Sequence, residues 1–187
     1  MVELSAIVIA KDEEGNIAAC LEGLAWADEV LVVDTGSTDG TVEIASQLAH
    51  RVLQEPFTDF PTVRNRALEE ATGRWVLFID ADERLSGDLA QEIGAALQKS
   101  VSVEGEVAGQ REVVGYWIPR NNLILGRWVK HAGWWPDYQL RLFRRDRGRY
   151  DPQRQVHEVL LLDGPTEKLS NPIIHYNYTS FRQLLAK

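Results

Sequence analysis

Two aspartates that stand one residue apart, Asp80 and Asp82, directly follow the apolar run at 75–79. Two carboxylates at a strand end can address the same side of a turn and hold a hard divalent cation. Mg²⁺ and Mn²⁺ prefer such oxygen ligands and are commonly shared with substrate phosphates. Because Asp-x-Asp also occurs in exposed turns, its position after a buried run is what favours the functional interpretation. We therefore predict a metal and phosphate site at Asp80, Ala81 and Asp82.

A further aspartate, Asp34, ends the apolar segment 29–35 and opens the string Asp-Thr-Gly-Ser, which carries the catalytic carboxylate in aspartic proteases. Such a protease is an all-β protein with two of these loops, whereas this sequence has one loop and alternates between strands and helices. The protease hypothesis is therefore rejected. Asp34 is predicted to face a ligand, with capping of the next helix as the structural alternative. Ser37 or Thr38 is predicted to cap that helix, which begins near Thr41.

Two more charged residues are candidates for the same site. Glu13 follows the first predicted strand, or else lies in the first turn of a helix, where the helix dipole favours an acid. Arg64, in a predicted helix that opens with Pro61, is a candidate for neutralising a phosphate or an exposed helix arginine. The sequence has neither Gly-x-Gly-x-x-Gly after the first strand nor a Gly-rich phosphate loop. A dinucleotide-binding dehydrogenase is therefore disfavoured, and a bound phosphate must be neutralised by metal and basic side chains.

The elements that position these residues alternate regularly in the front half of the chain. Apolar runs predict strands, and the segments between them place apolar residues at helical spacing. Strands that are apolar on both faces and separated by helices imply a parallel sheet covered on both sides. Ligands of such sheets bind outside the carboxyl ends of the strands, where the acidic residues lie. Strands are predicted at 4–10, 29–35, 51–55 and 74–83, and helices at 16–24, 41–49, 61–72 and 87–99, the last capped by Ser86.

The back half is less periodic, and we predict a smaller mixed β region there. A polar connection at 100–112 precedes it, a long loop is predicted at 123–137, and 179–187 is predicted to begin a helix. Four tryptophans are expected to divide between core packing and an acceptor wall. They are Trp117, Trp128, Trp134 and Trp135, and the strands are predicted at 113–121, 138–145, 157–164 and 173–178.

Composition narrows the function classes further. A chain of 187 residues with 44% apolar content suits one compact domain. Its single cysteine excludes an internal disulfide, and no segment reaches the roughly 18–20 apolar residues that span a bilayer. Residues 1–110 hold 7 Lys/Arg and 21 Asp/Glu, net −14, whereas residues 111–187 hold 13 and 7, net +6. The acidic half argues against nucleic-acid binding. The basic half could bind phosphates or lipid head groups, and the alternative is that its charge is ordinary surface composition. We expect a cytoplasmic protein with at most peripheral membrane contact.

The segments that contain these candidates are together similar to one known family. They read AIVIAKDEEGNI, VLVVDTGSTDGT, FPTVRNRALEEATGRWVLFIDADERLS and WWPDYQLRLFRRDRGRYDPQRQVHE. In this order they resemble family 2 glycosyltransferases of the GT-A fold, in the branch that includes lipopolysaccharide-core glucosyltransferases. The resemblance implies one α/β, Rossmann-like GT-A domain over 1–187, with a nucleotide-sugar-binding half at 1–99 and an acceptor-binding half at 113–187. Members of this branch usually continue past the position of Lys187, so the acceptor half is expected to be C-terminally shortened.

The resemblance also implies roles for the candidate residues. The reaction would transfer a sugar from a nucleotide diphosphate donor, by default a UDP-hexose, with inversion at the anomeric carbon. This chain departs from many members at Lys11-Asp12, where Tyr-Asn is common, and at Thr35, where a second Asp is common. The main chain at Ala10, with Glu13 and Asp34, would line the nucleotide pocket, and Arg64 would approach the diphosphate. Asp80, Ala81 and Asp82 would form the Asp-x-Asp motif, with Asp82 as the direct ligand of Mn²⁺ or Mg²⁺.

An inverting transfer needs a base that removes the proton of the acceptor hydroxyl. Asp137 matches the position at which the family places this base, with a turn aspartate as the structural alternative and Glu158 as the second candidate. His157 is expected to complete the metal shell, with His175 as a weaker candidate and a structural role as the alternative for both.

The predicted function is a metal-dependent inverting glycosyltransferase that acts on a saccharide or lipid-linked acceptor of the cell envelope, as in lipopolysaccharide biosynthesis. A truncated domain that binds nucleotide sugar without transferring it is one alternative. A sugar nucleotidyltransferase is the other, but it requires a Gly-rich, basic loop after the first strand, where residues 11–16 are acidic.

Overall fold

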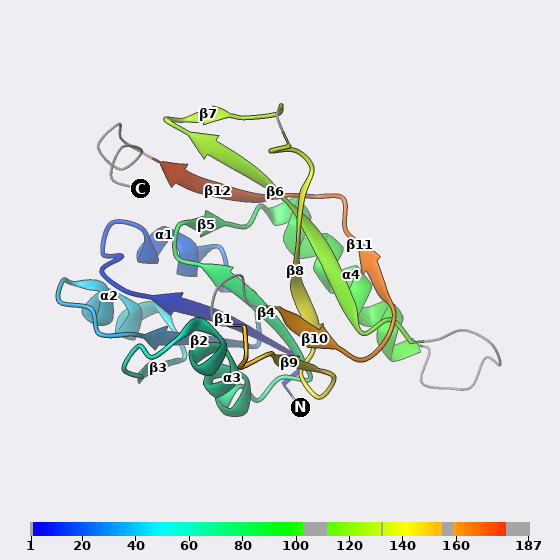
Figure 1. Ribbon diagram of the computed structural model, residues 1–187, viewed down its shortest axis with the longest axis horizontal. Helices are drawn as coiled ribbons and strands as arrows, with labels where there is room; N and C mark the ends of the chain where they lie inside the picture. Colours follow the sequence, from blue (N-terminus) through cyan, green and yellow to red (C-terminus); the bar gives the residue numbers. More distant parts are fainter. Residues whose placement is uncertain (1, 103–111, 132, 155–158, 179–187) are drawn as a thin grey trace.

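The computed structural model describes residues 2–102, 112–131, 133–154 and 159–178. Within these residues, one large mixed sheet runs through the molecule and helices cover its parallel part (Figure 1). Its strands follow the order β3-β2-β1-β4-β8-β6-β12-β5, and β7 and β11 also pair with β6. The bounds of the remaining small sheet, β9 and β10, are Gly148–Tyr150 and Leu160–Leu162.

The front half confirms the predicted alternation of four strands and four helices. The four strands are mutually parallel, because β1 pairs with β2 and β4, and β2 pairs with β3. The strands are β1 (Leu4–Ala10), β2 (Glu29–Asp34), β3 (Arg51–Gln54) and β4 (Trp75–Asp80), and the helices are α1 (Ile17–Glu22), α2 (Thr41–Leu48), α3 (Phe60–Glu70) and α4 (Gly87–Ser102).

The core lies in two layers, one on each face of the parallel strands. On one face, Val8 of β1 belongs to a cluster with Ile17 of α1 and Ile93 of α4. On the other face, Ile7 belongs to a cluster with Val63 of α3. Successive side chains of a strand point to opposite faces, so burial on both sides explains why the runs are apolar throughout.

The back half adds antiparallel strands to the edge of β4. Strand β8 (Asp137–Arg144) runs antiparallel to both β4 and β6 (Gly115–Ile124). Strand β12 (Ile173–Tyr178) runs parallel to β6 and antiparallel to the short β5 (Glu83–Arg84), which follows the Asp-x-Asp motif. The pairing of β5 with β12, and of β12 with β6, brings the Asp-x-Asp motif close to these two longer strands. Strand β11 (Thr166–Lys168) extends the other end of β6.

The prediction of a loop at 123–137 is wrong for the first residues of that range. Strand β6 continues to Ile124, and β7 (Arg127–Trp128) pairs back onto it. Leu125 and Gly126 connect the two strands with positive φ angles of 51° and 75°. Two consecutive residues with positive φ form the tight turn whose twist matches that of a β-hairpin. The sequence signal for this turn is weak because one of the two residues is leucine, where asparagine, aspartate or glycine is usual. The helix predicted at 179–187 lies outside the described residues.

Candidate active site

The sheet register brings the acidic strand ends to one edge. Ala10 lies opposite Asp34 across β1 and β2, and Ile9 lies opposite Asp80 across β1 and β4. Three residues predicted for the site therefore share the carboxyl edge of the parallel strands, which is where ligands of such sheets bind.

Two loops at this edge are joined by hydrogen bonds. The backbone N–H of Asp12 donates to Ser37 Oγ at 2.9 Å, and the Thr38 N–H donates to Asp12 Oδ1 at 2.7 Å. The predicted capping of α2 by Ser37 or Thr38 is therefore wrong: both residues bind Asp12, and Gly40 occupies the N-cap position without a side-chain bond. Asp12 itself adopts a positive φ of 53°, so this loop has a fixed, uncommon shape.

Asp34 is buried, with 2% of its surface exposed. Its carboxylate accepts hydrogen bonds from the backbone N–H groups of Gly36 at 3.1 Å and Ser37 at 3.2 Å. Gly36 has a φ of 97°, which favours glycine. Beside this turn, the Thr35 N–H donates to the Ala10 carbonyl at 2.9 Å. Asp34 thus holds the turn that follows β2.

Glu13 faces the same edge from the first loop. Its carboxylate accepts a hydrogen bond from Asn16 Nδ2 at 2.8 Å. Burial raises the pKa of Glu13, and the nearby negative charges of Asp82 and Asp39 raise it further, against the lowering by Asn16. Arg84 links this loop to the Asp-x-Asp motif, because it donates to Asn16 Oδ1 at 3.2 Å and to the Ala81 carbonyl at 2.8 Å.

Asp80 is held by two arginines. Arg141 of β8 forms ion pairs with Asp80 Oδ2 at 2.6 Å and with the fully buried Glu83 at 3.1 Å. Arg64 of α3 lies 3.6 Å from Asp80 Oδ1, with its guanidinium over the rings of Phe78 and Tyr150. Desolvation raises the pKa of Asp80, but the charges of Arg141 and Arg64 outweigh it and hold that pKa well below its usual range. Arg64 is therefore a buried residue and not an exposed helix arginine.

Asp82 contacts a histidine from the C-terminal part of the chain. His175 Nε2 lies 3.2 Å from Asp82 Oδ2, and its Nδ1 lies 2.7 Å from Asn122 Oδ1. The histidine that the structure brings to Asp82 is thus the weaker of the two predicted candidates. His157 and Glu158 lie outside the described residues.

Asp137 begins β8 and lies close to the same histidine. Its Oδ2 accepts hydrogen bonds from Arg120 Nε and Asn122 Nδ2, both at 2.9 Å, and its Oδ1 accepts from Gln139 Nε2 at 2.6 Å. Burial raises the pKa of Asp137, but the bonds from Asn122 and Arg120 and the Arg120 charge lower it below the ordinary aspartate value. Asp137 is therefore an ionised carboxylate at neutral pH.

Four residues of this network were not predicted from the sequence. Arg120 and Asn122 occupy alternate positions of β6 and therefore point to the same face of that strand, and this spacing could have drawn attention to them. The charged residue that directly follows the Asp-x-Asp motif, Glu83, was a further signal. The residues are Glu83, Arg120, Asn122 and Arg141.

The donor set at Asp82 suits a divalent cation that is also bound by a phosphate-containing ligand. Asp82 offers a carboxylate and His175 an imidazole nitrogen within 3.2 Å of each other. In the part of the chain that the structure describes, no group of three or more His, Cys, Asp or Glu side chains is arranged as a metal cage. Cations that are shared with substrate phosphates need only one or two protein ligands, so the pair fits this use.

Together, the fold and the acidic edge define a GT-A protein. TarS from S. aureus, in complex with UDP, superposes with a TM-score of 0.65 at 19% identity, covering 92% of this chain and 60% of that one. Glucosyl-3-phosphoglycerate synthase from Mycobacterium tuberculosis, in complex with Mn²⁺ and UDP, superposes with a TM-score of 0.59 at 17% identity, covering 99% of this chain and 75% of that one. The fold expected from the sequence is thus confirmed.

The chain belongs to glycosyl transferase family 2, whose sequence model matches residues 5–158. A curated relative is the lipopolysaccharide core biosynthesis glycosyltransferase LpsC of Rhizobium meliloti, which is 32% identical over 166 residues. That similarity covers 86% of this chain but 58% of LpsC, so the chain spans less than two thirds of this relative. Among the described residues, no helix is long and apolar enough to cross a membrane.

Proposed function

We propose that this protein is a metal-dependent, inverting glycosyltransferase that uses a nucleotide diphosphate sugar. The observation that supports this most directly is the meeting of Asp82, His175 and Asp137 at the carboxyl edge of a GT-A sheet. One end of this group suits a metal and a diphosphate, and the other end is an ionised carboxylate that can accept a proton. Transfer needs a metal site for the diphosphate and a proton acceptor for the hydroxyl, and both must contact the same bound substrates.

The diphosphate of the donor is proposed to bind at the Asp-x-Asp motif. Asp82 and His175 would hold Mn²⁺ or Mg²⁺, which acts as a Lewis acid that stabilises the leaving phosphates. The Asp80 carboxylate lies between Arg64 and Arg141, so its proposed role is to hold these two arginine side chains near the diphosphate. Arg64 keeps the phosphate role implied by the family resemblance.

The nucleotide is proposed to bind beside the loops that follow β1 and β2. In this proposal Glu13 and the main chain at Ala10 would line the nucleotide pocket, and Asp34, which holds the turn at Gly36, would shape it. UDP is the proposed nucleotide, since both structural relatives described above bind UDP. The hexose attached to it follows from the family resemblance.

Asp137 is the proposed general base. The acceptor hydroxyl attacks C1 of the donor sugar, its proton passes to the Asp137 carboxylate, and the bond from C1 to the phosphate oxygen breaks. The electron pair of that bond leaves with the nucleotide diphosphate, so one displacement inverts the anomeric configuration. Arg120 and Gln139 hold Asp137 in place, and Glu158 remains the second candidate.

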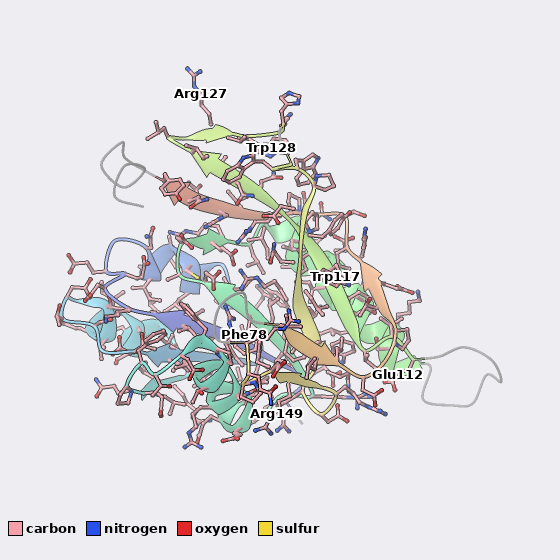
Figure 2. The ribbon with its side chains drawn as sticks, in the orientation of Figure 1. Phe78, Glu112, Trp117, Arg127, Trp128 and Arg149 are labelled. Atoms are coloured by element: carbon pink, nitrogen blue, oxygen red, sulfur yellow. The ribbon has the colours of Figure 1, made fainter. Side chains whose placement is uncertain are left out.

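The acceptor is proposed to be a saccharide or lipid-linked saccharide of the cell envelope, as the similarity to LpsC suggests. Near Asp137, the rings of Trp128 and Trp135 meet edge to face with centroids 5.1 Å apart, and Lys130 Nζ lies 4.0 Å from the Trp128 ring. Figure 2 shows Arg127 pointing away from the sheet at the β7 edge. Aromatic faces with flanking cations suit a sugar that lies at a membrane surface, so we propose a cytoplasmic location with peripheral membrane contact.

Incubation with a panel of UDP-, GDP- and dTDP-sugars, Mn²⁺ and cell-envelope saccharides tests the proposal. We expect nucleotide release from one donor class, and we expect Asp137→Asn to lower turnover by about 10²–10⁴-fold while sparing donor binding. The matched control is Asp163→Asn, whose side chain is 89% exposed and far from the proposed reaction. Binding of a donor without release would favour the non-catalytic alternative, and binding of none would overturn the proposal.

A further inference from the structure

One buried amide joins the two ends of the candidate site. Asn122 is 1% exposed and lies on β6, between β8 on one side and β12 on the other. Its Nδ2 donates to Asp137 Oδ2 at 2.9 Å, and its Oδ1 lies 2.7 Å from His175 Nδ1. His175 in turn reaches Asp82 at 3.2 Å. A single chain of contacts therefore runs from Asp82 through His175 and Asn122 to Asp137.

The chemistry of Asp137 fixes the direction of the two hydrogen bonds that Asn122 makes in this chain. An ionised carboxylate only accepts, so the Asn122 group that faces Asp137 must be the NH₂. The Asn122 oxygen then faces His175 and can only accept, so His175 Nδ1 must carry a proton. In the neutral imidazole this leaves a lone pair on Nε2, the nitrogen that faces Asp82.

From this geometry we infer that Asn122 is a positioning residue with two separate tasks: it selects the His175 tautomer whose Nε2 can bind a cation beside Asp82, and it orients the Asp137 carboxylate. The inference rests on the proposed function for the meaning of both tasks. Outer groups that donate to or accept from a metal-binding histidine typically alter metal affinity or activity by about 10–100-fold when they are removed.

Two substitutions of Asn122 separate the tasks. Asn122→Asp keeps an acceptor for His175 Nδ1 but loses the donor to Asp137 and adds a like charge beside it. We expect it to retain the tautomer and Mn²⁺ affinity of the wild type, and to lower kcat more than it changes KM. Asn122→Ala removes both partners, so we expect a mixed tautomer and a loss of Mn²⁺ affinity of about 10–100-fold. Asn121→Ala is the matched control. Asn121 is the residue before Asn122 on β6, and its side-chain oxygen is buried without a hydrogen-bond partner in the described structure.

The measurements are the ¹⁵N NMR shifts of the His175 ring at a pH where the imidazole is neutral, and Mn²⁺ titration by calorimetry. His175→Ala assigns the signals. The inference is overturned if Asn122→Ala keeps both the Nδ1–H tautomer and the Mn²⁺ affinity, or if Asn122→Asp and Asn121→Ala change turnover equally. If Asn122→Ala does not fold, Asn122→Asp alone still tests the orientation of Asp137.

The two proposals fail in different ways. If the wild type releases no nucleotide from any donor, the proposed function fails, whereas the ring shifts of His175 in the variants still test tautomer selection by Asn122. If the wild type turns over but its His175 carries the proton on Nε2, the positioning role fails and the proposed function stands.

Discussion

Replacing Arg141 by methionine tests the buried charges behind the Asp-x-Asp motif. Arg141 pairs with Glu83, which is fully buried, at 3.1 Å and with Asp80, whose side chain is 37% exposed, at 2.6 Å. At an effective dielectric constant of about 20, the attraction to Glu83 is worth about 5 kcal/mol. The Asp80 contact adds less because solvent screens it. Arg120 stays 3.3 Å from Glu83 and offsets part of the loss. We therefore expect Arg141→Met to lower the free energy of unfolding by about 3–5 kcal/mol, as for other broken buried pairs.

Urea denaturation at neutral pH measures this loss. With an m-value of about 1–3 kcal/mol/M, the midpoint should fall by at least about 1 M. Arg147→Met is the matched control, since that side chain is 44% exposed and should change stability by less than about 1 kcal/mol. Adding Glu83→Gln to Arg141→Met should cost less than the sum of the two single changes, because no uncompensated carboxylate remains. A loss under about 1 kcal/mol for Arg141→Met, or strict additivity, would refute the reasoning.

Two further predictions concern the edge of the site. The pKa of Asp137 is lowered in the folded protein, so its contribution to stability is present above the ordinary value near 3.9 and is lost as pH falls through the lowered value. The Asp137 carboxylate should accordingly stay ionised down to about pH 4, and an NMR titration of its carboxyl carbon with a midpoint near pH 6 would contradict this. Gly36→Ala should cost about 1–2 kcal/mol in urea denaturation through its φ of 97° alone, because no atom lies within 4 Å of the added Cβ. Gly15→Ala, equally open but without a positive φ, should be close to neutral.

The parallel half of the fold was predictable because its signals are local. The runs that became β1, β2 and β4 are apolar on both faces, and helical spacing is clear between them. Their carboxyl ends meet at one edge by topology, so the grouping of Asp34 with Asp80 followed from strand order. The one failed detail there, the capping of α2, failed because Ser37 and Thr38 bind a residue some 25 positions away.

The rest of the site depends on long-range pairing that periodicity does not reveal. His175 meets Asp82 only because β12 pairs with both β5 and β6, and β5 has two residues and no detectable pattern. Likewise, Arg141 reaches Asp80 because β8 pairs with β4 across a sequence gap that contains an unpredicted hairpin. The family resemblance pointed to Asp82, Asp137 and Arg64, but not to Arg120, Arg141 or Asn122.

We propose that Asp82 and His175 hold a cation that binds the diphosphate of a nucleotide. Calorimetric titration of UDP into the protein, with Mn²⁺ and then with a chelator, tests it most directly. We predict that Mn²⁺ strengthens UDP binding in the wild type, and that Asp82→Ala and His175→Ala both abolish the gain while leaving metal-free binding unchanged. Equal UDP affinity with and without Mn²⁺, or a gain that survives both substitutions, would contradict the account.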